Sequence, residues 1–310
     1  MKTKLFNSTS QSAPAPAVTS GSTFIILAAV LWALDGVIRR SLYSLSPMTI
    51  VFYEHLAGSI LLAPFFIPLL QKEVISAKSY CWAALVALLS GLLGTLWFTT
   101  ALIRVNFISF SVVFLLQKLQ PIFATTAAVI LLKEKITANY AKWAALALVA
   151  AFFVTFPGGK VNLSTGAQTV SAALFALGAA FAWGSSTAFS KKLLALQSNT
   201  VATGLRFYLT SVFAAAALLI FQPANPFPVL ETSQLVRFFF IALSTGMVAL
   251  VIYYRGLSMV QAKVATILEL VFPVLAILID ATLYGSVLSF SQYAAAGLLL
   301  FAVYNTSKSN

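Results

Sequence analysis

The sequence predicts an all-α integral membrane protein with ten transmembrane helices in two inverted five-helix repeats. Of its 310 residues, 60% are hydrophobic and only 8% are charged, and the mean hydropathy is +0.96. One water-soluble core cannot hold so large a share of apolar side chains. The apolar runs are about twenty residues long, which is the length of a membrane-spanning helix and twice that of a barrel strand.

Residues 1–22 are rich in serine, threonine, alanine and proline, so we expect a disordered cytoplasmic tail. The apolar run that follows has no convincing small-residue cleavage site and ends at Arg39-Arg40. We therefore interpret it as the first transmembrane span and not as a cleaved signal peptide.

Apolar runs of sufficient length divide the rest of the chain. They predict spans at residues 23–40, 47–70, 80–102, 107–132, 139–157, 169–190, 200–221, 234–257, 262–284 and 290–306. Pro47, Pro157 and Gly158-Gly159 fall at span ends, where these residue types belong. The predicted domains are the first repeat at 23–157, a linker at 158–168, the second repeat at 169–306 and a tail at 307–310.

The basic residues predict the orientation. Ten spans put both termini on one side, and the lysines and arginines outside the spans number twelve on that side against five on the other. Cytoplasmic loops carry the excess of these residues. We therefore expect cytoplasmic termini in an inner (plasma) membrane, and we ascribe the net charge of +12 to topology and not to nucleic-acid binding.

The two halves of the chain align at a nearly constant offset. The matched landmarks are Trp32 with Trp183, Arg39-Arg40 with Lys191-Lys192, His55 with Arg206, and Pro121 with Pro273. Each half has five predicted spans, which is an odd number, so the second half must be inverted relative to the first. Transporters are often built from such duplicated halves, with the substrate site between them.

An ordered set of motifs resembles the EamA-type proteins of the drug/metabolite transporter superfamily. The set comprises Leu31-Trp32, Ala182-Trp183-Gly184, Arg206, the alanine-leucine end of the third span, and the run that contains Glu134. The resemblance extends from about Phe24 to Tyr304. It implies ten helices, with helices one to four and six to nine around a central cavity and helices five and ten at the periphery.

The chain departs from that family pattern at two places. It has Glu54-His55 where such proteins often carry arginine, and Ser286 where a glutamate equivalent to Glu134 is usual. We therefore do not infer the substrate from the resemblance alone.

Charged residues inside spans are costly, so each needs a partner or a function. The predicted substrate-binding residues are Trp32, Asp35, Glu54, His55, Gln117, Lys118, Trp183, Arg206 and Glu269. We expect Lys118 to pair with Glu54 or Asp35. We expect Arg206 to pair with Glu269, either as a structural bridge or as part of a substrate site.

Two prolines within spans predict breaks in their helices. Pro121 and Pro273 each follow a polar residue by four positions, Gln117 and Glu269 respectively. A proline ring prevents the hydrogen bond to the carbonyl four residues back, so both carbonyls should be free beside their own polar side chains. Such a place would suit a polar ligand.

The candidates for proton coupling are His55, Glu54 and Glu269. His55 is the only histidine of the chain, and its ring titrates near neutral pH. A histidine satisfied within the core is an equally good interpretation. Arg206 cannot release its proton in an ordinary protein setting and would instead hold a carboxylate.

No catalytic constellation occurs. The chain has one cysteine, Cys81, and lacks both a G-x-S-x-G motif and a phosphate-binding glycine-rich loop. We expect no catalytic residues, metal or cofactor, and no nucleic-acid partner. The predicted partners are a small-molecule substrate and the lipid bilayer, with the chain as a monomer or homodimer.

The predicted function is a secondary transporter. It would be an exporter or exchanger of a small polar or zwitterionic metabolite, such as an amino acid or related compound, by alternating access. The alternative is an intramembrane enzyme that uses Glu54 and His55 on a lipid-embedded substrate. A lipid-associated scaffold is the third hypothesis.

Overall fold

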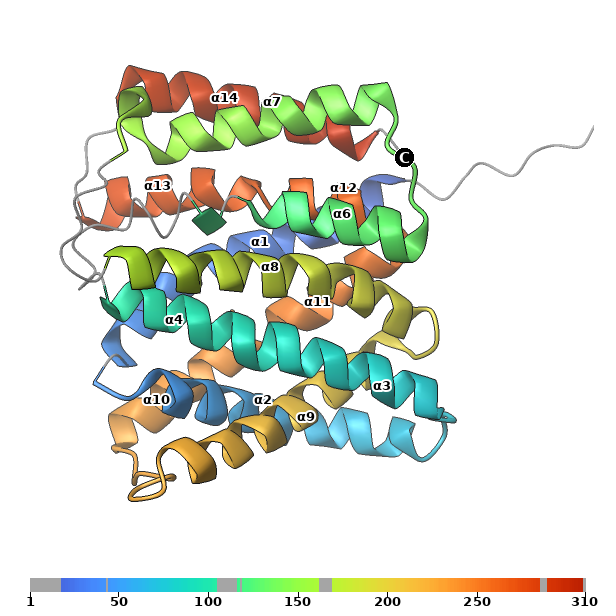
Figure 1. Cartoon of the computed structure of the whole chain (residues 1–310), viewed down its shortest axis with the longest axis vertical. Coiled ribbons are helices and arrows are strands. Elements are labelled where there is room, and N and C mark those ends of the chain that lie inside the picture. Colours follow the sequence, from blue (N-terminus) through green and yellow to red (C-terminus); the bar gives the residue numbers. More distant parts are fainter. Residues whose placement is uncertain are drawn as a thin grey trace, which may run out of the picture.

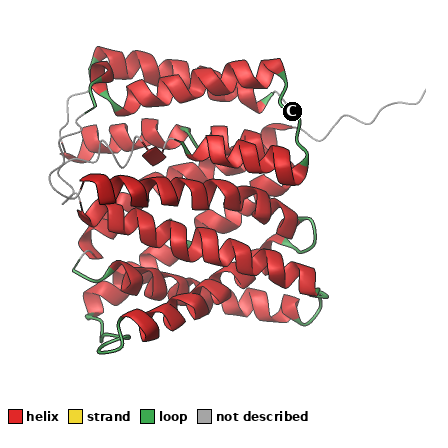
Figure 2. Ribbon diagram, in the orientation of Figure 1, coloured by secondary structure: helices red, strands yellow, loops and turns green. Residues whose placement is uncertain are grey.

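The computed structural model describes residues 18–42, 44–104, 116–117, 119–161, 169–284 and 289–308. Within these ranges the regular structure is entirely helical, with no strand (Figure 2), which confirms the predicted all-α class. Most of the predicted tail, Lys118 and Ser286 lie outside the described residues. So do residues 105–115 of the predicted fourth span and the side chains of Arg39, Arg40 and Asp280.

The described helices of the first half overlap the predicted spans, although the first begins at Val18, inside the predicted tail of residues 1–22. They are α1 (Val18–Arg39), η1 (Arg40–Leu42), α2 (Pro47–Leu70), α3 (Ala77–Val86), the π-helix η2 (Ala87–Gly94), α4 (Thr95–Arg104), α6 (Gln120–Leu132), α7 (Ala138–Thr155) and η3 (Pro157–Gly159). Gly158 and Gly159 follow α7 with φ of 61° and 73°. Glycine is the residue that adopts this left-handed conformation without steric cost.

The second half repeats this order. Its helices are α8 (Thr169–Leu194), α9 (Asn199–Phe221), α10 (Thr232–Leu243), α11 (Met247–Met259), α12 (Ala262–Leu268), α13 (Val271–Tyr284) and α14 (Phe290–Ser307). Serine or threonine residues cap the N-termini of several helices in both halves. Ser46, Ser198 and Ser289, for example, each accept a hydrogen bond from the backbone N–H three residues on.

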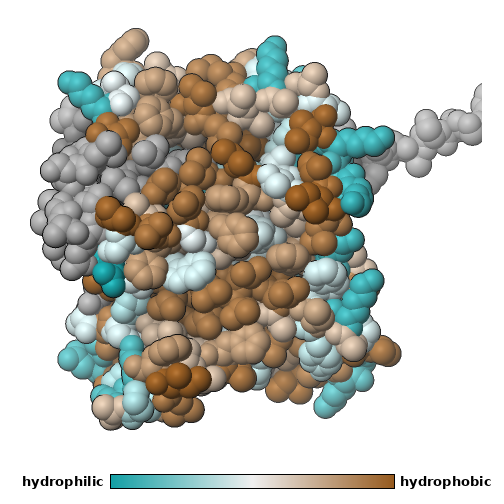
Figure 3. Space-filling view, in the orientation of Figure 1, coloured by the Kyte–Doolittle hydropathy of each residue, from teal (hydrophilic) through white to brown (hydrophobic). Residues whose placement is uncertain are grey.

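Six described helical segments are long and apolar enough to cross a membrane. They are Pro47–Leu70, Ala77–Arg104, Ala138–Thr155, Val170–Leu194, Asn199–Phe221 and Thr232–Met259. Hydrophobic side chains cover the middle of the face seen in Figure 3, and hydrophilic ones gather towards its edges. This is the surface expected of a membrane-embedded bundle. The count of ten spans stays a prediction, because the fourth span is described only in part.

The helix contacts of one half have counterparts in the other. Helix α1 packs against α11 and α13, and α8 packs against α4 and α6. Likewise α2 packs against α10, and α9 against α3. The pairs α2 with α9 and α7 with α14 join the halves directly. Helices α1 and α8 cross the bundle in opposite directions, and α7 and α14 lie together at one end of it (Figure 1).

Helix α12 ends at Leu268 and α13 begins at Val271, two residues before Pro273. The predicted break at this proline is therefore confirmed. The predicted free carbonyl of Glu269 is wrong, however, because the backbone N–H of Phe272 donates a hydrogen bond of 3.0 Å to it. The chain turns tightly after α12, so a donor three residues on replaces the missing one four residues on.

Candidate substrate-binding cavity

A cavity of about 330 Å³ lies between the two halves. Its walls come from α1, α2, η2, α4, α6, α8, α9, α11, α12, α13 and the residues that join them, and no described residue of α7 or α14 contributes. It brings together eight of the nine predicted substrate-binding residues, namely Trp32, Asp35, Glu54, His55, Gln117, Trp183, Arg206 and Glu269. The ninth, Lys118, lies outside the described residues, as does its predicted pairing.

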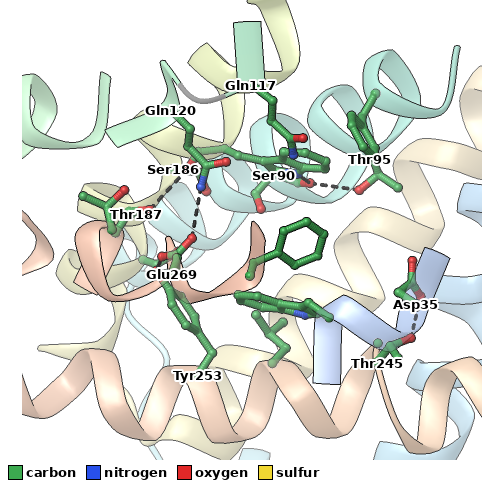
Figure 4. A pocket seen from close by; sticks show the side chains of 18 of the residues that line it. Asp35, Ser90, Thr95, Gln117, Gln120, Ser186, Thr187, Thr245, Tyr253 and Glu269 are labelled. Atoms are coloured by element: carbon green, nitrogen blue, oxygen red, sulfur yellow. Dashed lines mark hydrogen bonds between the residues drawn. The ribbon is translucent and has the colours of Figure 1, made fainter. Parts of the chain in front are cut away.

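Glu269 occupies the turn between α12 and α13 and is bonded to both halves (Figure 4). Tyr253 Oη of α11 donates a hydrogen bond of 2.7 Å to Glu269 Oε1. Gln120 Nε2 of α6 donates one of 3.1 Å to Glu269 Oε2. The bond from Gln120 ties Glu269, in the second half, to the first half across the cavity.

Arg206 does not form the predicted ion pair with Glu269. Its Nη1 lies 3.4 Å from Tyr254 Oη, to which it donates, and its guanidinium carbon lies 5.9 Å from the centre of the Tyr254 ring. Tyr253 and Tyr254 are consecutive on α11, so their side chains diverge by about 100° and reach different neighbours. Tyr253 therefore bonds to Glu269, and Tyr254 bonds to Arg206.

The opening helix of each half contacts an irregular point in the third helix of the other half. Asp35 Oδ1 of α1 accepts a 2.5 Å hydrogen bond from Thr245 Oγ1, which lies between α10 and α11. Trp183 Nε1 of α8 donates a 3.0 Å bond to the carbonyl of Ser90 in the π-helix η2. Figure 4 shows the Asp35–Thr245 contact well away from Glu269 across the cavity.

Aromatic rings form much of the cavity wall. The centroid of Trp32 lies 5.1 Å from that of Tyr253, and Trp183 lies 5.2 Å from Phe98. Gly94 makes room for one of these rings, because a Cβ there would lie 2.5 Å from Trp183 Cδ1. Two tryptophans with aromatic neighbours offer flat apolar surfaces to a ligand.

Glu54 and His55 are buried neighbours on α2, with 6% and 4% of their surfaces exposed. His55 Nδ1 lies 2.8 Å from the carbonyl of Val51. A carbonyl can only accept, so Nδ1 carries the hydrogen in this bond. The ring also lies 5.1 Å from that of Phe207. The proposed role of these two residues in proton coupling stays a prediction.

Unpaired polar atoms are concentrated in the cavity wall. Of the eight buried side-chain atoms without a hydrogen-bond partner in the described parts of the chain, five belong to cavity residues: Thr99 Oγ1, Gln117 Oε1, Ser186 Oγ, Arg206 Nε and Thr266 Oγ1. A buried polar atom left without a bond costs about 1–3 kcal/mol. Within the described parts of the chain, the wall therefore holds hydrogen-bonding capacity that a bound molecule could use.

The sequence profile of the EamA-like transporter family matches residues 19–156 and again residues 170–307. These two matches cover nearly the whole chain. The chain belongs to the EamA-like transporter family. It is therefore a multi-pass membrane transporter of the drug/metabolite transporter superfamily, which confirms the resemblance seen in the sequence.

Two further comparisons agree with this assignment. The EamA-like chain is 37% identical over 293 residues to the riboflavin transporter ImpX of Fusobacterium nucleatum subsp. nucleatum, covering 94% of this chain and 98% of the relative. It also matches a crystal structure with a TM-score of 0.72 at 14% identity, over 94% of this chain and 99% of that one. The second likeness concerns the fold alone. Family and relative indicate a transporter and give the intramembrane-enzyme alternative no support.

Several wall residues of this EamA-like transporter were not among the predicted ones. Tyr253 and Gln120, which bind Glu269, are the most prominent. Thr99, Ser186 and Thr266, with their unpaired hydroxyls, are also among them. The internal repeat could have indicated Ser186, since the offset that aligns Trp32 with Trp183 also aligns Asp35 with Ser186. Helical spacing places Thr266 on the same face as Glu269, three residues on. An uncharged tyrosine in a span carries no comparable signal.

Proposed function

We propose that this EamA-like transporter carries riboflavin or a closely related flavin across the membrane. The observation that carries the proposal is the cavity wall, which combines aromatic faces with unpaired hydrogen-bonding atoms. A flavin has a flat ring system and a hydroxylated side chain, and so offers a partner to both kinds of surface. A riboflavin transporter that is 37% identical over 98% of its own length supports the same substrate.

The proposed mechanism is alternating access by two inverted five-helix halves. The opposite directions of α1 and α8 (Figure 1) and the matched helix contacts support the inversion. The excess of twelve basic residues over five supports cytoplasmic termini in an inner membrane. In such transporters one half rocks against the other around a site near the membrane centre. Glu269, bonded to Gln120 and Tyr253 from different halves, is placed to respond to that motion.

A zwitterionic metabolite such as an amino acid is the second candidate substrate. Arg206 and Glu269 both line the cavity, and these two described residues are not paired with each other. A guanidinium could hold a substrate carboxylate while Glu269 holds an ammonium group. Glu269 would then have to exchange at least one of its present bonds.

Transport by the purified protein in liposomes distinguishes the two candidates. We expect riboflavin preloaded inside the vesicles to drive saturable exchange of labelled riboflavin, with no competition from an amino-acid panel. Trp32→Ala and Trp183→Ala should each weaken it, whereas Trp143→Ala, on α7 outside the cavity, should not. Exchange of an amino acid without exchange of riboflavin would refute the flavin proposal and favour the zwitterion.

A further inference from the structure

Three of the unpaired cavity atoms are hydroxyls of almost fully buried residues. Thr99 on α4, Ser186 on α8 and Thr266 on α12 are 1%, 2% and 1% exposed, and in the described parts of the chain none of their hydroxyls has a partner. We call these three the hydroxyl triad. Its members come from both halves, and all of them line the cavity. Figure 4 shows Ser186 beside Ser90 and Gln120 in that wall.

Their lack of partners is unusual for hydroxyls on helices. Serine and threonine within a helix commonly donate to the carbonyl three or four residues back, and the residues on either side of Ser186 do so. Ser185 Oγ donates to the carbonyl of Phe181 at 2.6 Å, and Thr187 Oγ1 donates to that of Trp183 at 3.3 Å. Among the described residues Ser186 does not make the bond that both neighbours make, and it lines the cavity.

The chemistry of the triad restricts the group it would bind. A hydroxyl both donates and accepts, and the unpaired Oε1 of Gln117 in the same wall can only accept. A ligand that offered only carbonyls would leave Gln117 Oε1 unpaired. A ligand hydroxyl suits each of these four atoms, because it can both donate and accept.

We propose that the hydroxyl triad, with Gln117, forms the subsite for the hydroxylated side chain of the flavin. This inference rests on the proposed function and specifies how the site selects its substrate. The aromatic walls hold the ring system, which all flavins share, and the triad distinguishes a flavin with its polyhydroxyl chain from the bare ring. A site built to bond hydroxyls rejects an analogue that lacks them, because its own buried groups then stay unpaired.

The proposal predicts opposite effects of one substitution on the empty and the loaded protein. Removing a hydroxyl that has no partner should not lower the melting temperature of the empty protein, and can raise it. The same substitution should weaken binding of the hydroxylated ligand. A hydroxyl with a purely structural role would lower the melting temperature and leave ligand preference unchanged.

The test compares riboflavin with lumiflavin, which has the same ring system and a methyl group in place of the chain. Flavin fluorescence gives the affinities of the purified full-length protein for both. We expect the unaltered protein to prefer riboflavin by about tenfold or more. Thr99→Val, Ser186→Ala and Thr266→Val should each weaken riboflavin binding about three- to tenfold and change lumiflavin binding by less than about twofold.

Thr203→Val is the matched control. Thr203 is fully buried on α9 outside the cavity, and its hydroxyl donates to the carbonyl of Asn199 at 2.7 Å. This change should leave the riboflavin-to-lumiflavin ratio intact. Equal binding of both flavins by the unaltered protein, or equal losses of both in the triad variants, would overturn the subsite while flavin transport stood. Binding of neither flavin would refute the proposed function itself, and the subsite with it.

Discussion

The cavity and the junction between α6 and α12 both contain buried polar side chains, but they differ in whether those side chains are hydrogen-bonded within the chain. At this junction, which we define by Glu134, Tyr140 and Lys263, the polar side chains are bonded to the chain itself. Glu134 accepts from the backbone N–H groups of Ala262 at 2.8 Å and Lys263 at 3.1 Å. Tyr140 Oη donates to the carbonyl of Lys263 at 3.0 Å, and Lys263 Nζ donates to the carbonyl of Lys135. In the cavity, five polar atoms of described residues have no bond.

This difference distinguishes the polar groups of the junction, which stabilise the fold, from those of the cavity, which can bind a ligand. Lys263 is only 2% exposed, yet the protein provides both a carbonyl and the ring of Tyr140, 4.9 Å away, for its ammonium. Buried groups without such partners lower stability, so they persist where binding supplies the missing bonds. The junction should therefore govern stability, and the cavity should govern selectivity.

The largest effect should follow from Glu134→Ala. The change removes both acceptors at the start of α12, and hydrogen bonds to a charged group contribute about 1.5–3 kcal/mol each. We expect a loss of roughly 3 kcal/mol in unfolding free energy, measured as a lower melting temperature in detergent. Glu134→Gln keeps one acceptor oxygen and should lose less. An unchanged melting temperature in Glu134→Ala would show that the junction does not hold the two halves together.

Gly94→Ala should disturb the cavity wall without touching the junction. The added Cβ would lie 2.5 Å from Trp183 Cδ1, and such overpacking costs about 1–3 kcal/mol. We expect riboflavin affinity to fall about tenfold as the ring is displaced, because one tenth of the affinity corresponds to 1.4 kcal/mol. Gly297→Ala on α14 is the control, since no described atom lies within 4 Å of its added Cβ. Equal affinity in the two variants would exclude Trp183 from the site.

The smallest effect concerns pH. If His55 couples protons to transport, the transport rate should depend on pH, because histidine is the side chain that most readily gains and loses a proton near neutral pH. His55→Gln should flatten this dependence without abolishing binding, because an amide can also donate to the carbonyl of Val51. An unchanged pH profile in the variant would move the coupling to Glu54 or Glu269.

Charged residues and prolines in the sequence predicted part of the cavity wall and one helix break. A charged side chain in an apolar run must face a partner or a cavity, so Asp35, Glu54, Arg206 and Glu269 could be assigned to one interior. Pro273 likewise predicted the break between α12 and α13.

The sequence could not predict which groups bond to which. The choice of Tyr253 for Glu269 and Tyr254 for Arg206 depends on the direction of each side chain of α11. Whether a buried hydroxyl donates to its own helix, as Thr187 does, or stays unpaired, as Ser186 does among the described residues, is likewise decided by three-dimensional packing.

Protection of a single cysteine in the cavity tests the central claim most directly. Cys81 is the only cysteine and is exposed, so Cys81→Ser provides a cysteine-free background. Thr95→Cys then adds one cysteine at a half-buried cavity residue whose hydroxyl donates to the carbonyl of Ser90. Riboflavin should slow maleimide labelling at position 95 in a saturable way and leave labelling of Cys81 in the unaltered protein unchanged. Labelling at position 95 that saturating riboflavin does not slow would contradict the assignment of this cavity as the flavin site.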